Sequence, residues 1–599
     1  MNLLEALDIL TANDLKQLRK LTPIADRGTR KADMVAVLAR YLLSGDLRVV
    51  WERLSELEVK AIAEAVHCWD GAFDAVRFEA KYGALPSHFK SHSWSSTAYG
   101  RDPVPPSVLP LFFYHGEVPE DLRPRLAALA PCPAERPIAT LTDAQLPATL
   151  KVADAAEPLR RVTTEAVVRH DLPAVLRAIG QGGITVGAKT GLPGSATVVR
   201  LESVMLGGDW YGADDDQGAE RWAGGPIHPI RPFAWPLLLQ AAGLAKQEGS
   251  KLTLTARGNK ALSWPIEETV AQLFERWQRK GAPDELRRIE LIKGQTAKGA
   301  RLSAVVERRQ VIAAALRDCP AGCWIDIEEF FRQMKLRGHH FEVTYNPWGL
   351  YLCDPQYGSL GNNGGFEILE ARYCLVYLFE YLATLGMIDV AYTLPYYARY
   401  DYSDAWGTDE FRFLSRYDGL QYLRINPLGA FCLGLVTDYR PVQEVRLPLL
   451  AIGADLAMTL LREPQPNERL LLERIAKPVS GALWRLDPDA VLNHSAQADE
   501  RARIRDFIES AADAALPAAV RQLLDTVGER ATALVDAGPA RLIQCRDPAT
   551  AALLSSDPVT APHCARAGER LLCVPEPKLT AFRKGLAKLG LVLPETARG

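Results

Sequence analysis

The first 48 residues have the hydrophobic period of two α-helices joined by a basic turn. Thr11 is a suitable N-cap for the first helix, and the turn PIADRGTRK separates it from the second. The apolar positions of both helices return at helical spacing (Leu15, Leu18 and Leu21, then Met34, Val37, Leu38 and Leu42). Residues 1–48 are therefore predicted to form a helix–loop–helix module.

Two segments of different character follow. Residues 49–95 contain a helix that begins with Ser55 and Glu58 at capping-box spacing, and we predict a helical or winged-helix module there. Residues 96–160 are rich in proline and polar turns (RDPVPPSVLP, APCPAERP). Such composition is typical of a surface connection, so this region is the first expected domain boundary.

Between 161 and 270 the pattern changes to helices followed by short β-like runs. LPAVLRAIGQGGITV reads as an apolar helix followed by glycines and a short strand, and KTGLPGSATVVRLESVML as a turn and a helix. Residues 231–262 repeat this order of a helix followed by β-like sequence. A helix is predicted to end at Gly243, AKQEGSKLTLT to form a tight hairpin, and a last helix to start at Ala256. We therefore predict two winged-helix modules in 161–270.

The remaining chain divides into two further regions. Residues 271–440 combine a basic segment with a winged-helix-like module that carries an aromatic insert, YNPWGLYLCDPQYGSLGNNGG. A helix that ends at Gly386 before MIDVAY repeats the layout seen at Gly243. Residues 441–599 alternate strands and helices. The expected fold class is α+β, mostly α, in a multi-domain chain.

Composition narrows the class of protein without defining it. The 599 residues are 48% hydrophobic and 24% charged, with a net charge of -3, so a uniformly basic nucleic-acid coat is excluded and local basic faces are not. The sequence has no apolar run of membrane-spanning length, and its first residues do not have the pattern expected of a signal peptide. Its ten scattered cysteines are interpreted as mainly buried, reduced thiols of a cytoplasmic protein.

Motifs for common catalytic chemistry are missing from the sequence. It contains no phosphate-binding loop, dinucleotide fingerprint, H-E-x-x-H or G-x-S-x-G, so we expect a chain that is not an enzyme and needs no cofactor or metal. An unrecognised active site remains an alternative, drawing on Asp326, Glu328, Glu329 and His339. The adjacent His339 and His340 are interpreted as packing or phosphate contacts rather than metal ligands.

Clusters of lysine and arginine supply the positive evidence. Basic side chains in the first two helices and their turn suit phosphate neutralisation, with a solvated face as the equally weighted alternative. Others lie at the turns and helix starts of the two hairpin-bearing modules and in the basic segment. The candidate DNA-binding residues are Lys16, Arg19, Lys20, Arg27, Arg30, Lys31, Lys189, Thr190, Arg200, Arg257, Lys260, Arg287, Arg288, Lys293 and Lys298.

A second set of residues is able to stack on exposed bases, although packing of a loop against the core is the favoured interpretation. These are the aromatic residues of YNPWGLY together with Tyr396, Tyr397, Tyr400 and Tyr402.

Three stretches resemble known families. Residues 10–43 resemble a SAP-like DNA-binding module, and AIGQGGITVGAKTGLPGSATVVRL (178–201) resembles a signature of bacterial helicase-associated proteins with tandem winged helices. Residues 482–594 resemble the helicase-associated domain that precedes the motor of XPB-type helicases. The positions that keep the pattern of that domain are Leu516, Pro517, Val520, Leu523, Leu524, Asp525, Cys545 and Gly590.

The resemblance implies an accessory role in DNA metabolism. XPB-type proteins continue into helicase motifs, whereas this sequence stops at Gly599, so a motor is expected in a separate polypeptide. Relatives of this kind occur beside bacterial anti-phage genes. The expectation is a non-catalytic double-stranded-DNA-binding adaptor for a separate helicase, ATPase or nuclease, in antiviral defence or DNA processing. The alternative is a protein–protein scaffold with little DNA contact.

Overall fold

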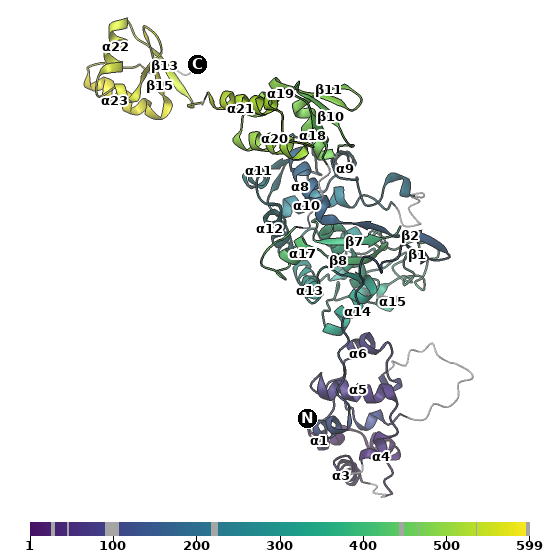
Figure 1. Cartoon of the computed structure of the whole chain (residues 1–599). Coiled ribbons are helices and arrows are strands. Elements are labelled where there is room, and N and C mark those ends of the chain that lie inside the picture. Colours follow the sequence, from purple (N-terminus) through teal and green to yellow (C-terminus); the bar gives the residue numbers. More distant parts are fainter. Residues whose placement is uncertain are drawn as a thin grey trace. The chain divides into compact units, whose positions relative to one another are not determined.

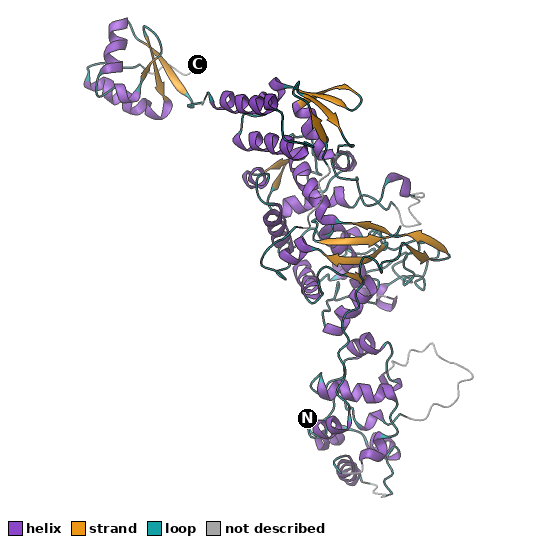
Figure 2. Ribbon diagram, in the orientation of Figure 1, coloured by secondary structure: helices purple, strands orange, loops and turns teal. Residues whose placement is uncertain are grey.

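The computed structural model divides the chain into two compact units, which are described separately. One unit comprises Met1–Arg446 with Gln465–Glu468, and the other Leu447–Pro464 with Arg469–Gly599 (Figure 1). Both mix helices with small antiparallel sheets, and helix predominates, as expected for an α+β chain (Figure 2). The structure describes residues 1–25, 30–44, 47–89, 107–216, 226–363, 365–441, 448–464, 466–534 and 536–594.

The N-terminal part of the larger unit is helical. Its helices are α1 (Leu3–Ile9), α2 (Ala12–Lys20), α3 (Lys31–Leu42), α4 (Leu47–Trp51), α5 (Glu56–His67), α6 (Ala75–Tyr82) and α7 (Arg123–Leu129). Thr11 caps α2 and Ser55 caps α5, each with a reciprocal carboxylate three residues later, so both predicted N-caps are confirmed. Leu15 and Leu18 are buried, which leaves the polar face of α2 to solvent.

The proline-rich region differs from the surface connection that the sequence predicts. Val108, Leu111 and Phe112 are fully or almost fully buried in the N-terminal helical core, because the apolar run SVLPLFFY outweighs its prolines. Farther on, a hairpin of β1 (Thr149–Val152) and β2 (Ala155–Pro158) follows, and Leu146 and Leu159 pack against Trp324. Much of 96–160 is therefore structural, while residues 90–106 lie outside the description.

The first helix-and-hairpin module is single, not double. It consists of α8 (Thr164–Gly180), α9 (Ser195–Glu202), α10 (Arg231–Ala241), β4 (Ala245–Glu248), β5 (Lys251–Leu254) and α11 (Ala256–Ala261). Thr185 forms a bridge with Lys251, and the Leu252 amide donates to the Ile184 carbonyl at 3.0 Å. The short run after α8 is thus the third strand of the β4–β5 hairpin. The two modules predicted within 161–270 share one sheet and one core.

The second module repeats this order around a four-stranded antiparallel sheet. Its strands follow the order β3-β7-β8-β6. The elements are β3 (Arg160–Val162), α12 (Ile266–Gln278), α13 (Val305–Arg317), β6 (Trp324–Asp326), α14 (Ile327–Arg337), α15 (Leu360–Asn363), α16 (Glu370–Leu375), a π-helical continuation (Val376–Leu382), β7 (Ile388–Tyr392), β8 (Leu420–Ile425) and α17 (Pro427–Cys432).

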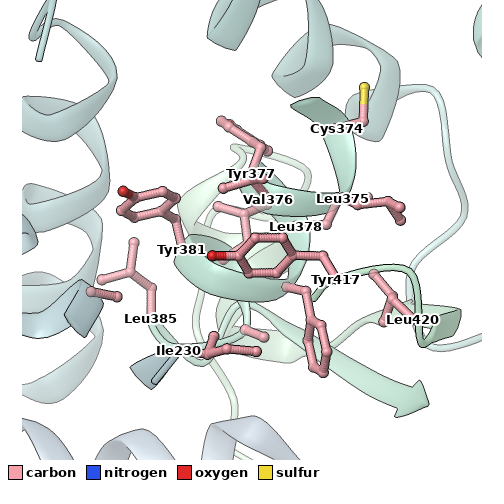
Figure 3. Packing of buried hydrophobic residues seen from close by; sticks show 14 of the residues in the cluster. Ile230, Cys374, Leu375, Val376, Tyr377, Leu378, Tyr381, Leu385, Tyr417 and Leu420 are labelled. Atoms are coloured by element: carbon pink, nitrogen blue, oxygen red, sulfur yellow. The ribbon is translucent and has the colours of Figure 1, made fainter. Parts of the chain in front are cut away.

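The long helix that starts at Glu370 lies at the centre of the larger unit. Every residue from 371 to 393 is buried, as in a helix enclosed on all sides. Tyr377, Tyr381 and Tyr417 point into the same apolar cluster (Figure 3). Gly386 ends the helix with φ +71°, and a β-carbon there would collide with Val168, so this glycine is required both by conformation and by packing.

The smaller unit contains two cores in sequence. The first has strands in the order β11-β12-β10-β9, and the second in the order β13-β15-β14. Their elements are β9 (Leu450–Ile452), β10 (Ala457–Leu460), α18 (Pro466–Ile475), β11 (Ala476–Ser480), β12 (Leu483–Leu486), α19 (Pro488–Asn493), α20 (Ala498–Ala511), α21 (Ala518–Thr532), β13 (Ala540–Gln544), α22 (Pro548–Ser556), β14 (Ala565–Arg566), β15 (Leu571–Pro575) and α23 (Leu579–Lys588).

Two global properties bear on the sequence predictions. Within the described ranges, no helix combines the length and apolar character needed to cross a bilayer. All ten cysteines are free, but only Cys319, Cys374 and Cys545 are buried, so the prediction of mainly buried thiols is wrong.

Glu370 gives the larger unit a pH-dependent stability. Its carboxylate accepts the Val343 amide at 3.0 Å, and burial raises its pKa from 4.5 to about 7. When the pKa of a carboxyl group is higher in the folded protein than in the unfolded chain, the group stabilises the fold fully at pH values below the pKa of the unfolded chain. That contribution is lost as the pH rises through the pKa of the folded protein. Glu370→Gln should therefore raise the Tm, relative to the parent chain, more at about pH 8 than at about pH 5. Thermal unfolding of this variant and of the control variant Glu307→Gln, at an exposed position, measures the effect; equal shifts of Glu370→Gln at both pH values would contradict it.

Candidate nucleic-acid interface

The N-terminal basic residues lie on the surface of α2 and at the start of α3. Lys16 and Lys20 are exposed and Arg19 is half-buried. Arg30 occupies the N-cap position of α3 without capping it by its side chain. Lys31 is exposed and pairs with Asp8 at 3.7 Å. Cations beside an uncapped helix N-terminus are unfavourable alone and favourable once an anion binds, because helix amides and side chains then face the same negative charge. Arg27 lies outside the described residues.

The turn that carries Lys189 and Thr190 is fixed by two glutamines. The turn closes on itself, with the Gly187 amide donating to the Leu192 carbonyl at 2.8 Å. Gln247 of β4 donates to the Gly187 and Ala188 carbonyls at 3.1 and 2.9 Å, and Gln240 of α10 donates to the Gly191 carbonyl at 3.0 Å. Lys189 and Thr190 are thereby held exposed beside the hairpin. The sequence analysis missed both glutamines, because it placed them in a different module.

Three exposed cations surround this turn and form what we term the hairpin cationic face: Lys189, Arg200 and Lys251. Arg200 extends from α9 over Gly183, where a β-carbon would collide with its guanidinium. Lys251 lies in β5 opposite Thr185. Lys251 was not among the predicted DNA-binding residues, although the hairpin strand that contains it was predicted. The face is predominantly positive, since the nearest hairpin carboxylate, Glu248, pairs with Lys246 at 2.6 Å.

The two candidate residues of α11 differ in their surroundings. Lys260 is exposed. Arg257 is half-buried, donates to Gln272 and lies over the Trp264 ring at 5.6 Å. The guanidinium of Arg257 thus joins α11 to α12, which leaves less of it available to a ligand.

The basic segment before α13 is divided between surface and core. Arg287 and Lys293 are exposed, and the Lys293 amine donates to the Glu290 carbonyl at 2.7 Å. The side chain of Lys298 is outside the description. Arg288 is buried and pairs with Glu380 at 2.8 Å, so its prediction as a DNA contact is wrong for this conformation.

Two arginines of α13, the helix that follows this segment, are internal as well. Arg309 pairs with Glu285 at 2.7 Å with both side chains fully buried, and Arg308 pairs with Asp284 at 3.0 Å. A guanidinium is stable in such an interior only when its charge and donors are satisfied. Much of the local positive charge that the sequence displays is therefore neutralised inside the protein.

The third helix of each module is enclosed. In α10 the residues from 234 to 239 are buried, and the helix that starts at Glu370 is buried throughout. The second helix of the first module, α9, keeps an open face with Arg200 and Val199, the latter 66% exposed. An insertion of α10 into a DNA groove is thus incompatible with this packing, whereas phosphate contacts from α9 and the neighbouring turn are compatible with it.

The four residues of the possible active site each have a structural partner. Asp326 caps α14, and burial raises its pKa. The partners are the Glu328 amide for Asp326, Arg399 for Glu328, Arg332 for Glu329, and Asp318 for His339. In the part of the chain that the structure describes, no three His, Cys, Asp or Glu side chains are grouped so as to hold a metal ion.

The tyrosines proposed to stack on bases fall into two classes. Tyr402 is buried, and Tyr396 packs against Phe413 at 5.6 Å between ring centroids. Tyr397 and Tyr400 are exposed and stack on each other at 5.9 Å. Of these four tyrosines only the latter pair is accessible to a partner, and in YNPWGLY the side chains of Tyr345 and Trp348 are exposed as well.

Comparison with known proteins adds no family assignment: no protein-family model matches the chain, and no curated protein has significant sequence similarity to it.

Proposed function

We propose that this chain is a non-catalytic adaptor that binds double-stranded DNA through phosphate contacts and docks a separate helicase, ATPase or nuclease. The observation that carries the proposal is the hairpin cationic face, where Lys189 lies in the turn, Arg200 lies over Gly183 and Lys251 is paired with Thr185. Lys189, Arg200 and Lys251 come from a loop, a helix and a strand, and all three are exposed. A rigid array of cations suits a regularly spaced polyanion.

The element order supports a winged-helix assignment for both modules. A winged helix has a helix, a strand, two helices and a hairpin, with the first strand paired to the last. The first module has this order, with Thr185 bridged to Lys251 of β5. The second has it with β6 paired to β8. In this proposal the modules contact DNA with α9 and the turn, not with the third helix.

The C-terminal unit is proposed as the docking region for the motor protein. Its resemblance to the XPB-type helicase-associated domain is supported by where the shared residues lie. Helix α21 begins directly after Pro517, and Val520 and Leu524 are buried in its core. Cys545 is buried beside α22, and Gly590 has φ +73° after α23. An antiviral role and a cytoplasmic location remain part of the proposal through that resemblance alone.

A salt-dependent gel shift with random duplex DNA tests the proposal. We expect binding at about 50 mM salt that weakens steeply towards about 200 mM, independently of sequence, because phosphate contacts release counterions. Absence of binding at the lower salt concentration would refute DNA binding.

The scaffold alternative is favoured by one observation, the burial of both third helices. If DNA contact is incidental, reversal of the N-terminal charges (Lys16, Arg19, Arg30 and Lys31 to Glu) should leave function in cells intact. Loss of both duplex affinity and cellular function in this variant would favour the adaptor over the scaffold.

A further inference from the structure

Exposed aromatic side chains gather in one region of the larger unit. Among the residues that the structure describes, every Phe, Trp or Tyr classed as exposed lies in 345–365 or 393–419. The first insert precedes α16, and the second lies between β7 and β8. The six side chains are Tyr345, Trp348, Tyr357, Tyr397, Tyr400 and Trp406. Exposed aromatic rings are enriched at binding sites, and their confinement to two inserts marks a surface that is not fully used within the chain.

The two inserts meet at a defined contact. The rings of Tyr357 and Trp406 lie 5.4 Å apart, with exposures of 59% and 55%. Beside them the Cys353 thiol donates to the Gly407 carbonyl at 2.9 Å. Gly407 has φ +79°, and a β-carbon there would lie only 3.1 Å from that of Cys353. The two inserts are therefore joined next to the rings by a hydrogen bond from a side chain to the backbone and by the close approach of Gly407 to Cys353. We call Tyr357 and Trp406, together with the carboxylates of Asp404, Asp409 and Glu410, the aromatic–acidic surface.

The charges around these rings are mainly negative. Asp404, Asp409 and Glu410 are exposed on the same insert as Trp406. Burial raises the pKa of the Cys353 thiol, Lys293 opposes that shift, and Asp354 and Asp409 add to it.

Among the described residues, the cations of this region include Lys293, Arg399 and Arg412, with Arg301 exposed beside Tyr345, whose amide donates to the Arg301 carbonyl at 3.1 Å. The Lys293 amine donates to the Glu290 carbonyl at 2.7 Å. Arg399 pairs with Glu328 and lies over Phe331 at 5.8 Å, and Arg412 is half-buried. A single strand of nucleic acid would bring its phosphates against the carboxylates of this surface, which disfavours base stacking on Tyr357 and Trp406.

We infer that the aromatic–acidic surface binds an arginine- and lysine-rich segment of a partner protein. A guanidinium stacks on Trp and Tyr faces and forms bidentate hydrogen bonds with carboxylates, so one side chain satisfies both features of the surface. This surface has the opposite charge to the hairpin cationic face, and the inference does not rest on DNA binding. It gives the larger unit a protein-docking site of its own.

The inference is tested on the full chain with a fluorescent dodecapeptide of alternating arginine and serine. Fluorescence anisotropy should show binding that weakens with salt. Tyr357→Ala with Trp406→Ala should weaken it about three- to thirtyfold, through loss of two exposed cation–π contacts. Asp404→Asn, Asp409→Asn and Glu410→Gln together should weaken it by at least about threefold, as expected for several exposed ion pairs.

Matched controls separate this site from general charge attraction. Glu52→Gln, Glu79→Gln and Asp154→Asn change the net charge equally at exposed positions elsewhere, and should leave peptide affinity unchanged. Circular dichroism and the Tm show whether each variant is folded. Three results would overturn the inference: no binding of the peptide, equal loss in the control variant, or binding of a dT dodecamer that requires Tyr357 and Trp406. Duplex affinity, measured on the same proteins, should be unaffected by the aromatic double variant.

Discussion

Replacing Arg288 with methionine should lower the free energy of unfolding of the larger unit by about 3–5 kcal/mol, the usual cost of leaving a buried charge without its partner. Arg288 donates to both carboxylate oxygens of Glu380, at 3.0 and 2.8 Å, and to the Pro229 carbonyl at 2.7 Å. Its guanidinium also lies over the Phe233 ring at 3.7 Å. Methionine restores part of the volume but none of the charge, so Glu380 would be left ionised in the interior or would have to take up a proton.

Urea unfolding followed by tryptophan fluorescence measures this loss. Eleven of the twelve tryptophans precede residue 447, so the signal reports mainly on the larger unit. The matched control is Arg287→Met, one residue away and exposed, for which less than about 0.5 kcal/mol is expected.

A double variant tests the electrostatic cause. Arg288→Met with Glu380→Leu removes both charges and should be less destabilised than Arg288→Met alone, since apolar pairs replace buried ion pairs at little cost. A double variant at least as unstable as the single one would show that packing, rather than the unpaired charge, accounts for the loss. Folded Arg288→Met protein, studied at low temperature, should retain full duplex affinity.

The second large effect is expected at the hairpin cationic face. Changing Lys189, Arg200 and Lys251 to alanine should reduce the slope of log affinity against log salt by about 2–3, because each phosphate contact contributes about 0.9. Duplex affinity at about 50 mM salt should fall by at least about tenfold. All three side chains are exposed, so the fold should be preserved.

The geometry of the turn supplies an independent check. Gln247→Ala removes the two side-chain hydrogen bonds to the Gly187 and Ala188 carbonyls but leaves every cation in place. If a rigid turn matters, this variant should weaken duplex binding without changing the salt slope. The control for the triple variant is Lys280→Ala, which removes an exposed lysine that follows α12 and lies outside the proposed face. A loss in the control as great as in the triple variant would mean that binding follows overall charge and not this site.

Sequence patterns predicted local elements well and the pairing between distant segments poorly. The caps at Thr11 and Ser55, the hairpin at 245–254 and the helix end at Gly386 follow from short-range chemistry, and the structure has them. The short strand near residue 185 was predicted, but its pairing with residue 251 was missed, because a local pattern does not indicate which distant segment a strand pairs with.

Charge patterns likewise did not indicate whether a basic side chain is exposed or buried. Arg287 and Arg288 are neighbours in a basic run, yet one is exposed and the other is enclosed by Glu380 and Phe233. The acidic partner lies 92 residues farther along the chain, beyond the range of any local reading. The aromatic residues posed the same difficulty, since Tyr400 is exposed and Tyr402 is buried two positions later.

The burial of α10 and of the helix that starts at Glu370 also bears on where the protein would be found on a chromosome. If both modules are winged helices that bind DNA, as proposed, these two helices are the ones that would read base edges inside the grooves, and their enclosure predicts binding with little direct readout of sequence. The protein's occupancy would scale with the length of available duplex, and any DNA would compete equally well for it. Positioning at a particular locus would then have to come from the proposed partner, with this chain supplying affinity for duplex DNA of any sequence.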